Sequence, residues 1–356
     1  MTRVVTDDAR QSDALPREDL DHILRHTDRV WPELANASVF VTGGTGFFGR
    51  WLVESFAAAN QEFALNARVV VLTRDPDAAT RRMPVVSRDP AIQFVRGDVR
   101  DFAFPSFSPT HVIHGATSTS ATLNAQRPLE MLDTIVGGTR RTMSFAGTRG
   151  VSRVLHLSSG AVYGVQPPDL ECVSEDYLGG PDPLDPNQAY AEGKRTSELI
   201  ASIAAREAGF DLTIARCFAF VGPGLPLHAH FAIGNFIRDA LEGGPIRIAG
   251  DGTPFRSYQH PADLMIWLWT LLVHGPQDRA YNVGSERAIS IQDLAHLIAD
   301  LAPEPCVVVR ALDPDPAKPA PRYVPCTRRA ERDLGLVERI SLPDAIERTI
   351  RWHRGR

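Results

Sequence analysis

Short apolar runs alternate with longer stretches of helical periodicity along most of the chain. Six runs have the length and composition of buried strands, at residues 39–41, 68–72, 92–95, 111–114, 154–157 and 212–215. Helical periodicity predicts three helices, at residues 46–59, 128–149 and 189–208. Strands that are apolar on both faces and alternate with helices are typical of a parallel sheet covered on both sides. The pattern therefore predicts an α/β fold with a doubly wound parallel sheet, whose ligand crevice lies at the carboxyl ends of the strands.

The two ends of the chain differ from the middle in composition and periodicity. Residues 1–37 are polar, with one amphipathic helix predicted over 17–30, and we expect them to form an extension beside the first strand. After residue 220, glycine and proline become frequent, short apolar segments lie among turns, and a last helix is predicted over 342–352. This predicts a sheet domain over 38–220 and a smaller C-terminal α/β lobe over 221–356, from which the chain can cross back into the sheet domain.

Composition and charge exclude several classes of protein. The 356 residues include 38 basic and 43 acidic ones, so the net charge of -5 gives no basis for nucleic-acid binding. The first residues are polar, and the longest apolar stretch, 264–273, is too short to span a bilayer. The four cysteines have no metal-ligand spacing, and His228 and His230 lack a third ligand. We therefore expect a cytoplasmic enzyme with free thiols, no metal and no membrane partner.

A glycine-punctuated turn follows the first predicted strand. Gly43, Gly46 and Gly49 have the spacing GxxGxxG directly before a predicted helix. Glycine permits the backbone angles of such a turn and lets a pyrophosphate approach the main chain, while the helix directs its unsatisfied N–H groups at that anion. The turn therefore predicts a dinucleotide site. Its candidate cofactor contacts are Gly43, Thr45, Gly46, Phe47, Phe48 and Gly49.

The tip of the second strand bears on the choice of nucleotide. An acidic residue there would accept a hydrogen bond from the ribose 2′-hydroxyl of NAD, whereas an arginine would pair with the 2′-phosphate of NADP. Thr73 occupies the tip, Arg74 follows it and Asp75 lies one residue further on. Arg50, just after the third glycine, could add a second cation. The sequence therefore permits either NAD or NADP.

The end of the third strand offers a contact for the adenine. Gly97 is followed by Asp98 and Val99. We expect Asp98 to accept a hydrogen bond from the exocyclic amine and Val99 to lie beside the base, although Asp98 could equally be a solvated loop aspartate.

A serine, a tyrosine and a lysine carry the predicted chemistry. Tyr190 and Lys194 are four residues apart in a predicted helix and therefore share a face. An ammonium near a phenol stabilises the phenolate and lowers the pKa of the tyrosine, and it can also bind the nicotinamide ribose. Ser159 ends a strand at a carboxyl edge, where its hydroxyl would donate to, or relay a proton with, a substrate oxygen beside Tyr190. Together with the glycine turn, these residues predict nicotinamide-dependent redox chemistry.

Several motifs follow one another in a familiar order. They are residues 41–49, His114-Gly115-Ala116, residues 157–164, Tyr190 with Lys194, Gly250-Asp251-Gly252-Thr253 with Arg256, and residues 281–285. In this the chain resembles the extended short-chain dehydrogenases/reductases of the NAD-dependent epimerase/dehydratase family, which act mostly on nucleotide sugars. The resemblance covers roughly residues 38–350 and implies a Rossmann domain that binds NAD(P), followed by a substrate-binding lobe.

The resemblance also implies roles for individual residues. Ser159, Tyr190 and Lys194 match the catalytic set, and Arg256 matches an arginine that grips the substrate pyrophosphate. Ala116 matches a cofactor contact after the fourth strand. Thr117, Ser118, Ser159 and Gly160 are further candidate substrate contacts. The implied partner is a nucleotide-diphosphate sugar, and the implied assembly is a homodimer formed through helices of the Rossmann domain.

One departure from the family narrows the reaction. Gly160 and Ala161 stand where the dehydratases of the family have an acid pair, and neither residue can move a proton. We therefore expect an epimerase that oxidises a sugar carbon, C4 by preference, to a keto intermediate and then reduces it from the other face. The alternatives are an NADPH-dependent 4-keto-sugar reductase, favoured by Arg74, and a 4,6-dehydratase with an acid from elsewhere, such as Glu192. From another class, a non-catalytic NAD(P)-sensing module would keep the fold without turnover.

Overall fold

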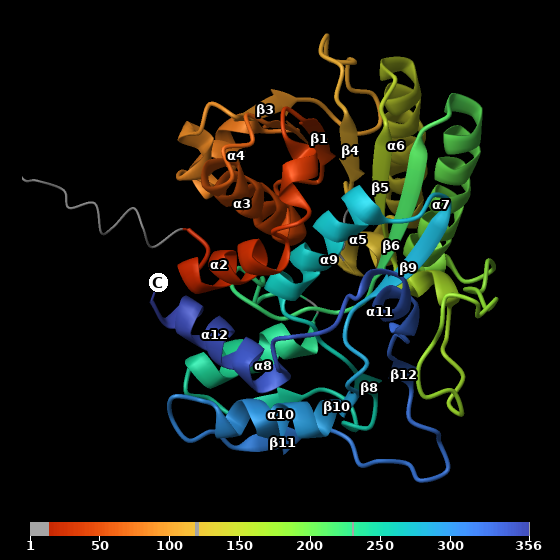
Figure 1. The fold of residues 1–356 in the computed structure, drawn as a ribbon. Coiled ribbons are helices and arrows are strands. Elements are labelled where there is room, and N and C mark those ends of the chain that lie inside the picture. The colour runs from red at the N-terminus through yellow and green to blue at the C-terminus, as the bar shows by residue number, and fades with distance from the viewer. Residues whose placement is uncertain (1–13, 118–120, 230, 356) are drawn as a thin grey trace, which may run out of the picture.

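The computed structural model describes residues 14–117, 121–229 and 231–355, which form a helix-covered parallel sheet with a smaller lobe beside it (Figure 1). The sheet has seven parallel strands in the order β3-β2-β1-β4-β5-β6-β9. Their bounds are β1 (Ser38–Thr42), β2 (Arg68–Thr73), β3 (Ile92–Arg96), β4 (His111–His114), β5 (Arg153–Ser159), β6 (Asp211–Cys217) and β9 (Arg279–Val283). The predicted doubly wound α/β fold is confirmed, and the strand order reverses between β1 and β4, where such sheets open their ligand crevice.

The two faces of the sheet are covered by different helices. Alternate residues of β1 divide between two apolar clusters, Val39 and Val41 in one and Phe40 in the other. The cluster around Phe40 includes residues of α6 (Pro128–Arg149) and α7 (Ala189–Ala208). The other cluster includes residues of α3 (Phe47–Glu62) and α9 (Pro261–His274). These helices therefore hold the sheet between two layers, and three of them correspond to the helices predicted from sequence.

The chain returns to the sheet beyond residue 220. Almost every residue of α9 is buried, as expected for the apolar stretch 264–273. Strand β9 then pairs with β6, so that Cys217 lies opposite Val283. The sequence pattern does not predict β9, because its sequence, Arg-Ala-Tyr-Asn-Val, has no continuous apolar run. Where the chain divides into two domains stays a prediction.

The N-terminal extension is tied to the far end of the chain. Helix α2 (Arg17–His26) ends earlier than predicted, and a 3₁₀ turn (Trp31–Leu34) follows it. The Thr27 hydroxyl donates to the Ile23 carbonyl (2.6 Å) and accepts from the Trp31 indole (2.7 Å), so polar contacts fix this change of direction. Buried Asp19 pairs with Arg348 of α12 (Leu342–Arg354), and α2 and α12 lie side by side in Figure 1.

The remaining elements form the smaller lobe and the connections. Strand β8 (Phe255–Arg256) lies between β10 (Ile289–Ser290) and β12 (Arg322–Tyr323), and β7 (Ile246–Ile248) pairs with β11 (Val308–Arg310). The other helices are α4 (Pro76–Arg82), α5 (Ala121–Gln126), α8 (Ala232–Leu241), α10 (Ile291–Asp300) and α11 (Arg328–Leu334). Among the described residues, no helix combines the length and apolarity needed to cross a bilayer.

Candidate active site

Two glycines of the turn after β1 are packed against the protein's own backbone, whereas the third faces open space. Gly43 has a φ of 78°, and a Cβ there would lie 2.6 Å from the carbonyl group of Gly115. A Cβ at Gly49 would lie 2.3 Å from the carbonyl oxygen of Gly43. Gly46 differs, because it is exposed and its Cβ would meet only the Gly43 carbonyl oxygen, at 3.5 Å. Among the residues that the structure describes, nothing requires a glycine at position 46, so this residue fits a turn against which a ligand packs.

Helix α3 begins at this turn with its amide groups available. Its N-cap is Gly46, which offers no side-chain acceptor to the first-turn N–H groups. The ring of Phe48 packs edge-on against Phe220, with centroids 4.9 Å apart, so what Phe47 and Phe48 can offer an anion is their main chain. The N–H groups and the positive end of the helix dipole suit a pyrophosphate. The turn therefore fits a dinucleotide.

The charged residues after β2 and β3 differ in their contacts: two aspartates are engaged, whereas Arg74 is exposed to solvent. Asp75 accepts a hydrogen bond from the Ala78 amide (3.0 Å) as the N-cap of α4, and this bond lowers the pKa of its carboxyl group. Asp98 is held by the Arg100 guanidinium through two hydrogen bonds (2.8 and 2.9 Å), which lower the pKa of Asp98. Arg74 is exposed, and no ion pair of Arg74 occurs among the described residues.

Arg50, considered as a second cation for the cofactor, is engaged elsewhere. Its guanidinium donates to Glu54 (2.7 Å) and lies 5.7 Å from the ring centre of Trp352. The Glu54 carboxylate also accepts from the Leu15 amide (2.7 Å), so the pair anchors the N-terminal extension. Nε of Arg50 is engaged by Glu54, and the suggestion that Arg50 serves the cofactor stays a prediction.

The end of β4 is held next to the glycine turn. The Thr42 hydroxyl lies 2.8 Å from Nδ1 of His114 and accepts from the amides of Gly115 and Ala116 (both 3.2 Å). Nε2 of His114 lies 3.0 Å from the Thr139 hydroxyl, whose own proton goes to a backbone carbonyl. His114 is therefore neutral with its proton on Nε2, consistent with burial lowering its pKa to about 3. It supports the loop that carries Ala116 and Thr117, while Ser118 lies outside the described residues.

The predicted serine, tyrosine and lysine come together at the ends of β5 and α7. Ser159 is the last residue of β5, and its side chain favours the phenolate of Tyr190, which lowers the pKa of that tyrosine. Lys194, only 3% exposed, donates from Nζ to the carbonyl oxygen of Leu157 (2.8 Å). Asn124 of α5 accepts from the Tyr190 amide (3.0 Å), which fixes the start of α7. Sequence reasoning missed Asn124, because 66 residues separate the two partners.

The electrostatics of this set differ from the expectation. Burial raises the pKa of Tyr190 above its ordinary value of 10, and the hydrogen bond from Ser159 offsets part of that rise. Burial also lowers the pKa of Lys194 to about 8. The predicted lowering of the Tyr190 pKa by Lys194 is therefore wrong for this structure, because the ammonium group is directed at the Leu157 carbonyl. Of the causes of the Tyr190 shift, only the Ser159 hydrogen bond favours the phenolate.

Gly160 has no room for a side chain. A Cβ at this position would lie 2.6 to 2.8 Å from three carbon atoms of the Phe218 ring. The backbone continues into a 3₁₀ turn (Gly160–Tyr163), where the Ser159 hydroxyl accepts from the Ala161 amide (3.2 Å). Phe218 therefore fills the space into which an acid at position 160 would project.

Two residues of the small lobe reach this region. The ring centre of Tyr323 in β12 lies 4.7 Å from that of Phe218, the ring that packs on Gly160. Arg256 is the partner of Tyr323 in the β8–β12 pairing, and no carboxylate pairs with its guanidinium among the described residues. Sequence reasoning missed Tyr323, because it lies in a proline-rich stretch that was interpreted as extended loops.

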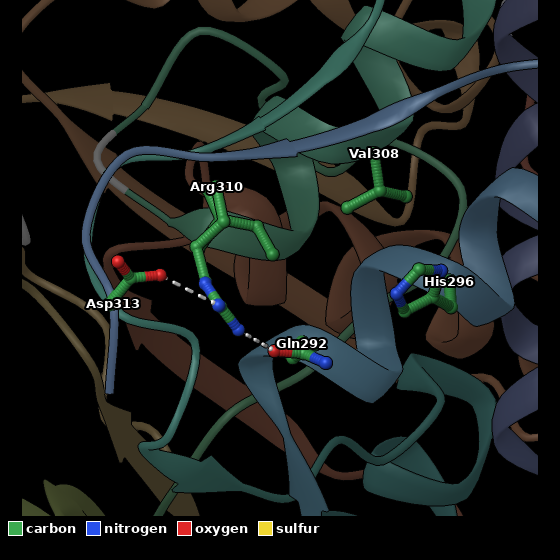
Figure 2. A pocket seen from close by; sticks show the side chains of 6 residues that line it. Gln292, His296, Val308, Arg310 and Asp313 are labelled. Atoms are coloured by element: carbon green, nitrogen blue, oxygen red, sulfur yellow. Dashed lines mark hydrogen bonds and ion pairs between the residues drawn. The ribbon is translucent and has the colours of Figure 1, made fainter. Parts of the chain in front are cut away.

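A separate cavity of about 240 Å³ opens in the small lobe, as Figure 2 shows. It is lined by Ile248, Gln292, His296, Val308, Arg310 and Asp313. The Arg310 guanidinium donates to Gln292 (2.6 Å) and Asp313 (3.2 Å), so its charge is already satisfied (Figure 2). None of the predicted site residues that the structure describes lines this cavity. Within residues 14–117, 121–229 and 231–355, no group of three or more metal-binding side chains occurs.

Comparison with known proteins shows the family to which this chain belongs. The family model described as "NAD dependent epimerase/dehydratase family" matches residues 39–284, which include the glycine turn, Ser159, Tyr190 and Lys194. The chain belongs to the NAD-dependent epimerase/dehydratase family. The resemblance inferred from the sequence motifs is thereby confirmed.

Three similar proteins are 26 to 29% identical to this chain over the aligned residues. UDP-glucuronic acid decarboxylase 6 of Arabidopsis thaliana is 26% identical over 312 residues, which are 88% of this chain and 87% of that protein. A dTDP-glucose 4,6-dehydratase of Streptomyces antibioticus is 28% identical over 324 residues, 89% and 92% of the two chains. The crystal structure of DesIV, a dTDP-glucose 4,6-dehydratase of Streptomyces venezuelae with NAD bound, superimposes with a TM-score of 0.75 at 29% identity, covering 89% and 97%.

Proposed function

We propose that this member of the epimerase/dehydratase family is a 4-epimerase of a nucleotide-diphosphate sugar, acting with NAD or NADP. The substrate class is supported by the relatives, which are named for UDP-glucuronic acid and dTDP-glucose. It is also supported by Arg256, whose guanidinium lacks a carboxylate partner among the described residues and suits a diphosphate. The dinucleotide would be held at the turn of Gly43, Gly46 and Gly49, and when bound it supplies a hydride acceptor and donor.

The chain's own residues provide the proton transfer. Tyr190, as phenolate, removes the proton of the sugar hydroxyl, while Ser159 holds the same oxygen by a hydrogen bond. The ammonium group of Lys194 has three N–H bonds, of which one is directed at the Leu157 carbonyl. The other two can hold hydroxyl groups of the nicotinamide ribose. The resulting keto sugar turns within the pocket, and Tyr190 returns the proton after reduction from the opposite face.

The choice of an epimerase over a dehydratase rests on the absence of an acidic residue at the position after Ser159. The relatives are named as a decarboxylase and a dehydratase, and a dehydratase must protonate the leaving hydroxyl to expel water. Here the Phe218 ring fills the space at Gly160, so no acid projects from that position. Glu192 is two residues from Tyr190 in α7 and therefore faces another direction. A site that oxidises and reduces without an acid suits epimerisation better than loss of water.

The reductase remains the second candidate, because Arg74 favours it. Its exposed guanidinium at the tip of β2 could pair with a 2′-phosphate, and the nearby acids Asp75 and Asp98 are engaged as a helix cap and with Arg100. A reductase would consume NADPH stoichiometrically, whereas an epimerase leaves its dinucleotide unchanged over a cycle.

We also propose a homodimer, which the surface of the α6 and α7 pair supports. Leu199 and Ile203 of α7 are 61% and 48% exposed, and Leu129 at the start of α6 is 74% exposed. Leu199 and Ile203 are four residues apart and so lie on one face of the helix. A second copy packing on this face would bury them.

The reaction can be tested with defined substrates. The protein is incubated with UDP-glucose or dTDP-glucose, the nicotinamide absorbance is followed, and the products are identified by NMR. We expect the C4 epimer and no stoichiometric change in absorbance. A 4-keto-6-deoxy sugar would establish a dehydratase, and stoichiometric loss of NADPH with a 4-keto sugar would establish the reductase. No turnover of any nucleotide sugar, with NAD(P) still bound, would favour the sensing module.

A further inference from the structure

We propose that Glu198 is a positioning residue for Lys194: its carboxylate fastens the end of β5 to α7 one helical turn beyond the ammonium group and supplies the negative charge that helps this ammonium keep its proton. The inference rests on the proposed function, in which the Lys194 ammonium holds the nicotinamide ribose. Glu198 follows Lys194 by four residues in α7, so the two side chains share one face of the helix.

Two consecutive residues of β5 are bound by this face of α7. The Leu157 carbonyl accepts a hydrogen bond from Nζ of Lys194 (2.8 Å), and the Ser158 hydroxyl donates to Oε1 of Glu198 (2.5 Å). The next residue of the strand is Ser159. The two contacts therefore fix where the ammonium group of α7 lies relative to the hydroxyl group at the end of β5.

The Glu198 carboxylate is itself held by Arg216 of β6, which lies opposite Ser158 in the sheet. Arg216 donates from Nε to Oε1 (3.0 Å) and from Nη2 to Oε2 (2.7 Å) of Glu198. Its third nitrogen donates to the Tyr163 hydroxyl (2.9 Å), which in turn donates to Asn282 of β9 (2.8 Å). A bidentate pair fixed in this way holds both the charge and the orientation of the carboxylate.

The other titratable groups that affect Lys194, or are affected by it, are uncharged at neutral pH. Burial lowers the pKa of His114 of β4 to about 3, and it lowers the pKa of His156 of β5 well below 6.5. Burial raises the pKa of the Cys217 thiol of β6 to about 12, so this thiol keeps its proton. Among the described residues, Glu198 is therefore the group that acts on Lys194 with a negative charge.

This charge matters because Lys194 titrates close to neutrality. Burial lowers the pKa of Lys194 to about 8, and the charge of Glu198 opposes that fall. An ammonium group has three N–H bonds, whereas a neutral amine has two. Since one bond is directed at the Leu157 carbonyl, loss of the proton would leave a single N–H for the ribose. Glu198 thus preserves the second ribose contact at neutral pH.

The ionisation of Lys194 can be measured directly, because the only lysines of the chain are Lys194 and Lys318. The whole protein is prepared with Cε-labelled lysine and titrated by NMR, and the two signals are assigned with Lys318→Arg. In Glu198→Gln, which keeps an acceptor for Ser158, we expect the midpoint of Lys194 to move to lower pH by on the order of one unit. In Arg216→Gln we expect it to move to higher pH, because the carboxylate then acts without the guanidinium.

These opposite shifts separate the inference from a general loosening of the fold, which would move Lys194 in one direction only. The exposed Lys318 is the internal reference and should not move in either variant. Glu207→Gln makes the same chemical change at an exposed position of α7 and should leave Lys194 unchanged. Glu198→Asp keeps the charge and should restore most of the shift seen in Glu198→Gln.

A parent-like Lys194 titration in Glu198→Gln, or shifts of the same sign in Glu198→Gln and Arg216→Gln, would overturn the inference. If Glu198→Gln does not fold, Arg216→Gln decides alone, and an unchanged or lowered midpoint there would overturn it. The alkaline limb of the kcat profile should move together with Lys194. The titration requires no substrate, so a protein without turnover on nucleotide sugars would refute the proposed function while the NMR result still decided the role of Glu198.

Discussion

Ser159, Tyr190 and Gly160 show how the chemistry of the site depends on single residues. Ser159 and Tyr190 bring two hydroxyl groups together, and Gly160 admits the Phe218 ring where an acid would otherwise project. In the proposed reaction, Ser159 and Tyr190 can therefore assist oxidation of a sugar hydroxyl without the elimination of water that would follow in a dehydratase. Two substitutions test these assignments separately.

Replacing Tyr190 by Phe should abolish turnover without loss of the fold. The variant lacks the proton acceptor, and removal of a general base lowers rates by about a hundredfold to ten-thousandfold. The measurement is kcat on a nucleotide sugar that the parent protein converts, with dinucleotide binding measured in parallel. Binding should be retained, because the glycine turn is untouched. A Tyr190→Phe variant with the parent's kcat would refute the catalytic assignment.

Replacing Gly160 by Ala should destabilise the protein through the Phe218 ring. The new Cβ would lie 2.6 Å from a ring carbon, and overpacking of this kind costs about 1–3 kcal/mol. The denaturant midpoint reports this loss. Gly250→Ala is the matched control, since nothing lies within 4 Å of its Cβ position and its φ is not positive. Equal midpoints for the two variants would mean that Phe218 does not occupy this space.

At the residue scale, local spacing was predictable and long-range partners were not. Tyr190 and Lys194 were placed on one helix face because that depends only on a spacing of four residues. The direction of the Lys194 ammonium was not predictable, since its acceptor at Leu157 is 37 residues away. The same holds for Asn124, whose partner Tyr190 is 66 residues away.

At the scale of elements, α6 and α7 combine a buried and an exposed apolar face. Met143 of α6 and Ala201 of α7 pack in the cluster beneath the sheet. Leu199 and Ile203 of α7 project from the other side. These two exposed apolar residues, four apart on a well-packed helix, are the basis of the proposed homodimer face.

Leu199→Glu should therefore dissociate the proposed homodimer. Burying a leucine contributes roughly 1.5–3 kcal/mol, and a symmetric interface loses this twice, so dissociation should become at least about a hundredfold easier. Analytical ultracentrifugation over a range of protein concentrations measures this. Leu312→Glu, at an exposed residue of the small lobe, is the control and should leave the assembly unchanged. If both variants sediment like the parent, the α7 face is not the interface.

The elements show which signals in the sequence are reliable. Strands β1, β2 and β4 were predicted because both of their faces are buried, which leaves continuous apolar runs. Strand β9 was missed because polar residues interrupt it, and its place in the sheet comes from pairing with β6. Helix α2 ends at His26 rather than at residue 30, because hydrogen bonds of Thr27 turn the chain.

At the scale of the whole molecule, buried histidines make the fold sensitive to acid. Burial lowers the pKa of His111 to about 4 and of His114 to about 3, and it lowers the pKa values of His156 and His260 well below 6.5. Below pH 6.5 these histidines bind protons in the unfolded chain but not in the folded one. The free energy of unfolding is therefore highest above pH 6.5 and decreases as the pH falls. Asp19 has the opposite effect on stability. Burial raises the pKa of its carboxyl group to about 6, so on acidification the folded chain binds this proton at a higher pH than the unfolded chain does. The net effect is a loss of stability between pH 6.5 and 4.

His260→Asn should weaken this pH dependence. Asparagine can replace the Nδ1 atom that caps the Ala262 amide (3.1 Å), and it does not titrate. The slope of unfolding free energy against pH should fall by one proton, about 1.4 kcal/mol per pH unit between pH 6 and 5. Denaturant unfolding at a series of pH values measures it, and the exposed His296→Asn serves as the comparison. A slope identical to that of the parent would mean that His260 is not held neutral in the folded state.

The fate of a deuterium label at C4 of a nucleotide-diphosphate hexose tests the central claim most directly. The label is followed by mass spectrometry and NMR after conversion by the parent protein. An epimerase returns the hydride to the carbon from which it came, so the product should have the mass of the substrate and keep deuterium at C4 with inverted configuration. A product lighter by one water, with deuterium on C6, would contradict the account. With a nucleotide-linked hexuronic acid as the substrate, a product that has lost carbon dioxide would contradict the account equally.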